Sequence, residues 1–192
     1  RGAARARPRG DAQLVVIWSE GSAEERVATS FMTGAGPAQV MFVADDRVVV
    51  TDECERAAKL LGVTSLRQLG LADLPALERL PPPLNHRAHH VITENDRVLA
   101  SMAALHAHDL KRFGALLYAG HGSLREAYAV SLPEIDLIVE LARHERGIYG
   151  ARMCGGGFGG VVLLAAVPGE ARPAAERIAK EYCVRSGRPG AL

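Results

Sequence analysis

The sequence predicts an α+β fold in which helices surround a small antiparallel sheet. Apolar residues recur at helical spacing across residues 85–106 and continue through 110–117, as expected of helices that bury one face. The glycine-rich segment 155–160 is followed by an unbroken apolar run, 161–167, which is typical of a buried strand. Helices grouped around the strands that flank this segment indicate the α+β class.

Residues 11–51 are predicted to form a short β segment before the main domain, residues 52–192. A strand is expected over residues 14–18, which are apolar throughout. The runs 39–44 and 47–50 are apolar after their first residues, Gln39 and Arg47, and are separated by two aspartates. This arrangement predicts a two-stranded hairpin.

The main domain is predicted to be largely helical. Gly62 should end its first helix, and the prolines 81–83 should form an extended connector. Ser131 and Glu134 have the spacing of a capping box, and the helix after them would turn Ile135, Ile138, Val139, Leu141 and Ala142 toward the core. The other predicted helices and helical turns span residues 52–61, 65–69, 73–80, 85–106 with its continuation, and 172–182.

The composition limits the possible partners. The chain has 192 residues, is 48% hydrophobic and carries a net charge of +1, so it can bury one substantial core or two small ones without a charge that implies nucleic acid or membrane as partners. Residues 1–10 carry four arginines without aromatic residues between them, which predicts a disordered basic arm. No apolar run approaches the roughly 20 residues that cross a bilayer, and no signal peptide opens the chain. The cysteines lack C-x-x-C spacing, so we expect reduced thiols in the cytoplasm; they are Cys54, Cys154 and Cys183.

The glycine-rich segment is the strongest candidate for a binding site. Consecutive glycines can take positive φ and can leave peptide N–H groups around a concavity that suits an anion. The sequence therefore favours phosphate or sugar-phosphate binding, while a tight turn between two strands is the alternative. The segment matches neither a P-loop nor the dinucleotide-binding fingerprint. The candidate residues are Gly155, Gly156, Gly157, Phe158, Gly159 and Gly160.

Other candidate residues carry weaker signals. Arg152 could pair with a phosphate, or it could form a salt bridge beside the strand. His86, His89 and His90 have a spacing that can place imidazoles on one helical face, with Glu94 one turn on, but no fourth ligand is evident and we expect no metal site. His121 and Ser123 are two residues apart, so in a helix their side chains diverge by about 200°. We expect them to serve capping or core packing rather than nucleophilic catalysis.

Several stretches resemble galactokinases, a branch of the GHMP small-molecule kinases. Residues 150–160, which include the glycine-rich segment, have the form G-A-R-M-x-G-G-G-F-G-G with Phe158, which is similar to the third motif of that family. Three further stretches are similar to galactokinase motifs and follow in the expected order. They are E-C-x-x-A-A-x-x-L-G-V from Glu53, R-x-H-H-V-I-T-E-N-D-R-V from Arg87, and H-G-S-L followed by Y-x-V-S-x-P-E-x-D from His121.

The resemblance implies a ferredoxin-like GHMP kinase C-terminal domain and a transferase that phosphorylates galactose at its anomeric hydroxyl with ATP and Mg²⁺. By this resemblance the glycine-rich segment would close over sugar and phosphate. Cys154 stands where galactokinases usually carry threonine, so a hydroxyl contact would be weakened there. Arg47 stands at the position of a tyrosine that lies at the sugar in the family, and the resemblance fails before residue 52.

The galactokinase motifs of the N-terminal half are absent from the sequence. These motifs are the sugar motif, the nucleotide loop and the aspartate base. We therefore expect the C-terminal part of a sugar kinase, a fragment that is inactive without the missing N-terminal kinase half. The alternative is a non-catalytic sugar-sensing or interaction module derived from a galactokinase.

Overall fold

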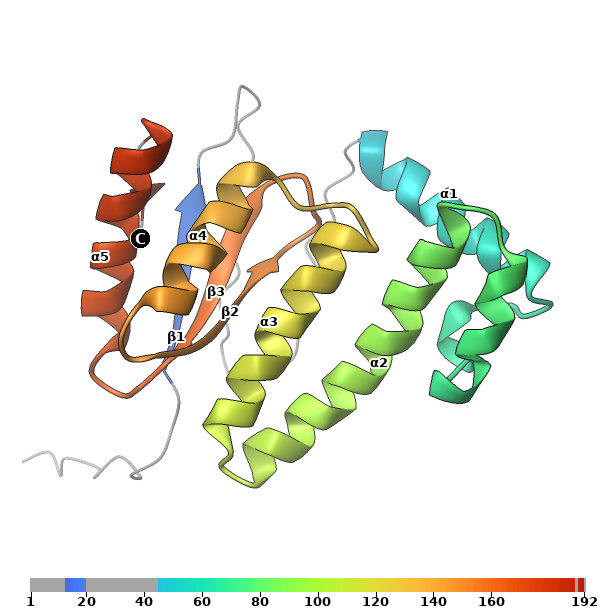
Figure 1. Ribbon diagram of the computed structural model, residues 1–192, viewed down its shortest axis with the longest axis horizontal. Coiled ribbons are helices and arrows are strands. Elements are labelled where there is room, and N and C mark those ends of the chain that lie inside the picture. Colours follow the sequence, from blue (N-terminus) through green and yellow to red (C-terminus); the bar gives the residue numbers. More distant parts are fainter. Residues whose placement is uncertain (1–12, 20–44, 189, 192) are drawn as a thin grey trace, which may run out of the picture.

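The computed structural model describes residues 13–19, 45–188 and 190–191, and its fold is α+β, as predicted (Figure 1). Two short 3₁₀ segments, η1 and η2, lie between the first two helices. In chain order the elements are β1 (Gln13–Ser19), α1 (Asp45–Leu60), η1 (Leu66–Gln68), η2 (Leu71–Arg79), α2 (Leu84–His106), α3 (Leu110–Glu126), α4 (Pro133–His144), β2 (Ile148–Cys154), β3 (Gly160–Ala166), α5 (Ala171–Ser186) and β4 (Gly190–Ala191).

The described strands form one antiparallel sheet in the order β2-β3-β1-β4. The strand predicted over residues 14–18 is confirmed as β1 and pairs along its whole length with β3, with Val16 opposite Leu163. On its other side β3 pairs with β2, and Arg152 lies opposite Leu163. Because β2 has a neighbour on one side only, its outer edge is left to the helices.

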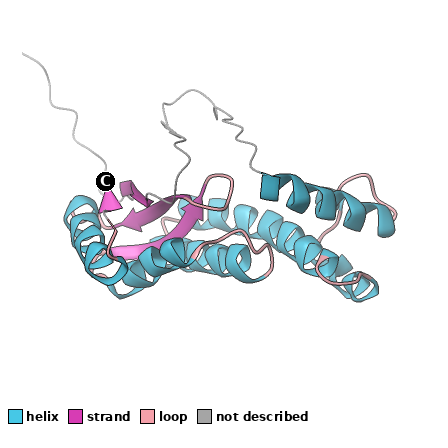
Figure 2. Cartoon of the chain, turned by 90° about the horizontal axis from the view of Figure 1, so that it is seen from above, coloured by secondary structure: helices cyan, strands magenta, loops and turns pink. Residues whose placement is uncertain are grey.

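Helices α4 and α5 pack against one face of the sheet, and Figure 2 shows the strands lying over this helical layer. The buried apolar residues of α4 and α5 therefore pack against the strands, as a layered domain requires. Ile135, Ile138 and Val139 of α4 are buried in this core, as predicted, and Leu141 packs against it. The other main contributors are Ala142, Ala151, Met153, Val162, Leu164, Ala175, Ile178 and Tyr182.

Helix α3 closes the outer edge of β2 through a contact between two glycines. A Cβ placed on Gly114 would lie 1.9 Å from the carbonyl oxygen of Tyr149, and one on Gly150 would lie 2.3 Å from the carbonyl oxygen of Gly114. Only residues without a side chain allow backbones to approach this closely. The pair therefore fixes where α3 crosses the strand.

A second core lies between α1, the two 3₁₀ segments and the first half of α2. Its buried residues include Ala57, Leu66, Leu77, Leu84 and Ile92. Gly62 has φ +74° and follows the last residues of α1, which confirms it as the C-terminal stop. The helices predicted to begin at residues 85 and 172 begin instead at Leu84 and Ala171, and α5 continues to Ser186.

Two local predictions were wrong. Residues 47–50 are not a strand of a hairpin, because α1 begins at Asp45 and runs through them; the first predicted strand, residues 39–44, and the basic arm, residues 1–10, lie outside the described residues. The β-branched valines here predicted a strand, but helix packing overrides such propensities. Ser131 and Glu134 do not form a capping box, since Leu132 is the N-cap of α4 and makes no side-chain cap. Pro133 starts the helix instead.

Candidate functional site

The glycine-rich segment is the loop that joins β2 to β3, so the alternative of a turn between two strands describes its place in the fold correctly. Most of its residues adopt a backbone conformation that side chains disfavour. Gly155, Gly157, Gly159 and Gly160 have φ between +89° and +120°, and Phe158 has φ +57°. A non-glycine residue in the left-handed region is uncommon and costs of order 1 kcal/mol. The loop therefore needs support from the surrounding structure.

The segment before α4 provides part of this support. The backbone N–H of Phe158 donates to the carbonyl oxygen of Val130 at 2.7 Å. A Cβ on Gly157 would lie 2.7 Å from Cβ of Val130, so this glycine allows the loop to lie directly against the valine. The ring of Phe158 packs against the main core. Gly155 has open space where a side chain would be and is exposed.

His121 supports the other end of the loop from α3. Its ring is buried, and its Nδ1 accepts the backbone N–H of Met153 at 3.3 Å. Its Nε2 lies 3.1 Å from Oδ1 of Asp136, which also accepts the hydroxyl of Ser131 at 2.6 Å. Burial lowers the pKa of His121, against an opposing effect of Asp136. The sequence predicted capping or core packing for His121, and its ring is buried and bonds Asp136 and Met153.

Arg152 forms the salt bridge that was the alternative to a phosphate contact. Its guanidinium pairs with Glu94 of α2, and Glu94 also accepts Nε of Arg97 at 2.7 Å. Burial alone would raise the pKa of Glu94, but Arg152 and Arg97 outweigh it and hold that pKa below its usual value. Arg152 keeps part of its side chain exposed.

The histidines of α2 do not gather around a metal position. His90 is buried, its Nδ1 lies 2.8 Å from Oγ of Ser123, and its ring stacks on Tyr128 with centroids 4.3 Å apart. Burial lowers the pKa of His90 to about 4. His86 and His89 are exposed, and Glu94 is engaged by the two arginines. In the part of the chain that the structure describes, no three or more His, Cys, Asp or Glu side chains are grouped as metal ligands.

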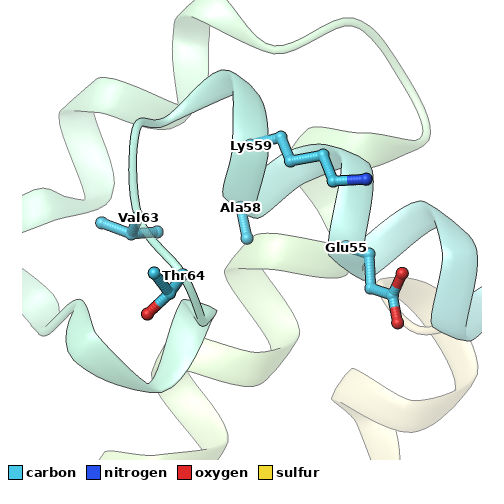
Figure 3. A pocket seen from close by; sticks show the side chains of 5 residues that line it. All are labelled: Glu55, Ala58, Lys59, Val63 and Thr64. Atoms are coloured by element: carbon cyan, nitrogen blue, oxygen red, sulfur yellow. The ribbon is translucent and has the colours of Figure 1, made fainter.

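Two further features bear on the choice of site. Cys154 ends β2 directly before the glycines and is exposed, and Cys54, Cys154 and Cys183 are all free thiols. A pocket beside α1 is lined by Glu55, Ala58, Lys59, Val63 and Thr64 (Figure 3), none of which belongs to the loop.

No helix among the described residues is long and apolar enough to cross a membrane.

Sequence reasoning found the loop but missed its supports. Val130 and Asp136 were noted only as parts of a motif, and their contacts join elements that lie far apart in the sequence. The hydrogen-bonding pattern could not be derived from helical or strand periodicity. The loop, the Val130 segment and His121 thus form one site at the end of the β2–β3 hairpin.

Comparison with known proteins identifies the architecture around this loop. Residues 101–184 match the model of the GHMP kinase C-terminal family. The chain contains a GHMP kinase C-terminal domain. The domain includes α3, α4, the β2–β3 hairpin with its glycine loop, and most of α5.

Galactokinases are similar to this chain over a longer stretch than the family model. The chain is 45% identical over 130 residues to the galactokinase of Thermotoga petrophila, covering 68% of this chain and 36% of that protein. It is 41% identical over 143 residues to the galactokinase of Actinobacillus succinogenes, again covering 36% of the relative. The chain therefore spans about a third of the length of these relatives.

A solved structure agrees with these sequence matches. The crystal structure of Lactococcus lactis galactokinase complexed with galactose superposes with a TM-score of 0.73 and 25% identity. The match covers 94% of this chain and 44% of the galactokinase chain. The α+β fold expected from the sequence is thereby confirmed as that of the galactokinase C-terminal region.

Proposed function

We propose that this chain is the C-terminal part of a galactokinase, which transfers the γ-phosphoryl group of ATP to the anomeric hydroxyl of galactose. The observation that carries the proposal is the β2–β3 loop, in which four glycines have positive φ and Gly157 lies directly against Val130. The 45% identity to a galactokinase supports the choice of substrate. The proposed site residues are Gly155, Gly156, Gly157, Phe158, Gly159 and Gly160, with Arg152 and Cys154 beside them.

The loop suits the part of phosphoryl transfer that a backbone can perform. Transfer requires positioned phosphates and an oriented nucleophile more than covalent chemistry from the protein. Gly155 is exposed with open space at its Cβ position, so phosphate or sugar atoms can approach its peptide closely. A side chain at this position would occupy that open space. The residues present therefore fit a phosphorylated ligand.

ATP and Mg²⁺ are the groups that this activity would require. Mg²⁺ is usually held by one or two carboxylates together with substrate phosphates and water, and it would neutralise charge on the phosphates when bound. Among the residues that the structure describes, those of the glycine loop would contact the phosphates, and Arg152 would add positive charge beside the loop. We assign the carboxylate ligands and the catalytic base to the N-terminal kinase half, which is the partner proposed for this chain.

Without that half we expect no turnover by this chain. The free, exposed thiols of Cys154 and Cys183 suit a reducing compartment, and we place the complete kinase in the cytoplasm. The alternative remains a sugar-sensing module without catalysis, which would bind galactose saturably and transfer no phosphate.

The test compares the native protein with the recombinant 192-residue chain. The native protein is isolated from its source cells with antibodies raised against this chain, its intact mass is measured, and ATP-dependent galactose phosphorylation is assayed for both. We expect a native protein longer by about one domain, roughly 150 to 200 residues, that is active beside an inactive recombinant chain. A longer native protein without galactose kinase activity would contradict the proposal, and saturable galactose binding by the inactive recombinant chain would favour the sensor.

A further inference from the structure

Met153, just before the glycine loop, and Phe158, within it, are connected by a series of hydrogen bonds and one covalent link that runs through α3 and the start of α4. It begins at the N–H of Met153, which donates to Nδ1 of His121 at 3.3 Å. The other ring nitrogen, Nε2, lies 3.1 Å from Oδ1 of Asp136. The same oxygen accepts the hydroxyl of Ser131 at 2.6 Å. Ser131 adjoins Val130, whose carbonyl accepts the N–H of Phe158 at 2.7 Å.

The donors and acceptors in this chain are fixed by chemistry. A backbone N–H can only donate, so Nδ1 of His121 must be the acceptor and carry no proton. The proton of the neutral ring is then on Nε2, which donates to Asp136. Burial of His121, a residue that is 3% exposed, disfavours the charged form of its ring. Asp136 faces the ring from α4, while Arg125 and Arg152 act on it from α3 and β2.

The position of Met153 explains why a hydrogen-bond acceptor such as His121 is needed beside it. Met153 lies in the edge strand β2, where a backbone N–H that points away from β3 has no strand partner. A buried N–H without an acceptor costs about 1–3 kcal/mol. The imidazole of His121 supplies that acceptor, and its second nitrogen carries the connection on to α4.

We propose that His121, Asp136 and Ser131 act as one positioning unit that sets the conformation of the glycine loop through Met153 before it and Phe158 within it. This inference rests on the proposed function only for the loop's role in binding, since the coupling itself is a property of this chain. The carboxylate of Asp136 bonds both His121 of α3 and Ser131 before α4, so a change at Ser131 reaches Met153 through the His121 ring, without direct contact between them.

Hydrogen exchange tests the coupling in the 192-residue chain. Exchange of individual amides is measured by NMR in wild type, S131A and S131T. We expect S131A to accelerate exchange at Phe158 and also at Met153, each by about tenfold for a loss near 1.4 kcal/mol. S131T retains a hydroxyl and should restore both rates. The amide of Leu164, in the central strand β3, serves as the reference and should keep its rate.

S123A is the matched control, because it removes a hydroxyl from α3 that bonds His90 and takes no part in this chain. Acceleration at Phe158 alone in S131A would overturn the proposal by showing two independent contacts. Equal acceleration at Leu164 would also overturn it, by showing general destabilisation.

A second measurement requires no variant. Long-range ¹H–¹⁵N spectra of wild type at pH 7 should show His121 as the neutral tautomer with its proton on Nε2. A proton on Nδ1, or a doubly protonated ring, is incompatible with acceptance from Met153 and would overturn the proposal. Neither measurement depends on kinase activity, so failure of the proposed function remains distinguishable from failure of the coupling.

Discussion

The carboxylate of Glu94 in α2 pairs with the guanidinium of Arg152 in β2, 58 residues away along the chain. The pair joins the long helix to the strand that leads into the glycine loop. Both side chains are largely buried, with 18% and 24% of their surface exposed. Loss of one partner therefore leaves the other charge poorly solvated.

We predict that Glu94→Gln lowers the free energy of unfolding by about 1–3 kcal/mol. Arg152 would lose its ion pair while remaining partly buried. Urea unfolding at pH 7 measures the effect. Glu140→Gln is the matched control, because Glu140 pairs with Arg143 and His144 on the surface and should change stability by less than about 1 kcal/mol. Equal losses in the two variants would contradict a special role for Glu94.

The same pair predicts a dependence of stability on acid. The pKa of Glu94 is held below its ordinary value of 4.5, so the unfolded chain takes up the proton first as the pH falls. The stabilisation is present above pH 4.5 and is lost as the pH falls through the lower folded pKa. Unfolding curves of wild type and Glu94→Gln should therefore converge in acid. A constant difference between them at all pH values would be the contrary result.

His90 predicts a second loss of stability on acidification, in a pH range above that of Glu94. Its pKa is about 4 in the folded protein and 6.5 ordinarily, so stability is complete above pH 6.5 and is lost as the pH falls toward 4. The full loss is of order 3 kcal/mol. His90→Gln removes this titration, and its free energy of unfolding should vary less between pH 7 and pH 5 than that of wild type. Equal variation would show that other groups, such as His121, dominate.

The contact between α3 and β2 predicts that Gly114→Ala will prevent normal folding or cost more than about 3 kcal/mol, because the new methyl group would overlap the carbonyl of Tyr149. Gly122→Ala is the control in the same helix. Nothing lies within 4 Å of its Cβ position, so helix propensity should make it neutral or stabilising by up to about 1 kcal/mol. Thermal unfolding of both variants separates backbone overlap from a general effect of alanine in α3.

In the loop, Gly157→Ala should destabilise more than Gly155→Ala. Both positions have positive φ and incur the same kind of backbone strain, but only the first would place Cβ against Val130. The difference between the two unfolding free energies measures the contact with Val130. A larger loss for Gly155→Ala would contradict the described loop conformation.

The sequence allowed prediction of those features that depend on local pattern. The helical periodicity of α2, the apolar strands and the glycine loop were all predicted, because burial of one face imposes a period on neighbouring residues. The start of α1 was not, since Val48, Val49 and Val50 favour a strand locally and the helix depends on its context. A salt bridge of Arg152 was one of the expectations, but its partner Glu94 and the pair His121–Asp136 were missed, because no local pattern encodes which distant side chains meet.

Galactose phosphorylation by a chimera tests the central claim most directly. In the Thermotoga petrophila galactokinase, the region that matches this chain over 130 residues is replaced by the corresponding residues from this chain. We predict ATP-dependent formation of galactose 1-phosphate, which is reduced when Gly157→Ala is introduced into the chimera and absent when the transplanted region is deleted. A chimera that unfolds cooperatively, and is therefore folded, but forms no galactose 1-phosphate would contradict the account.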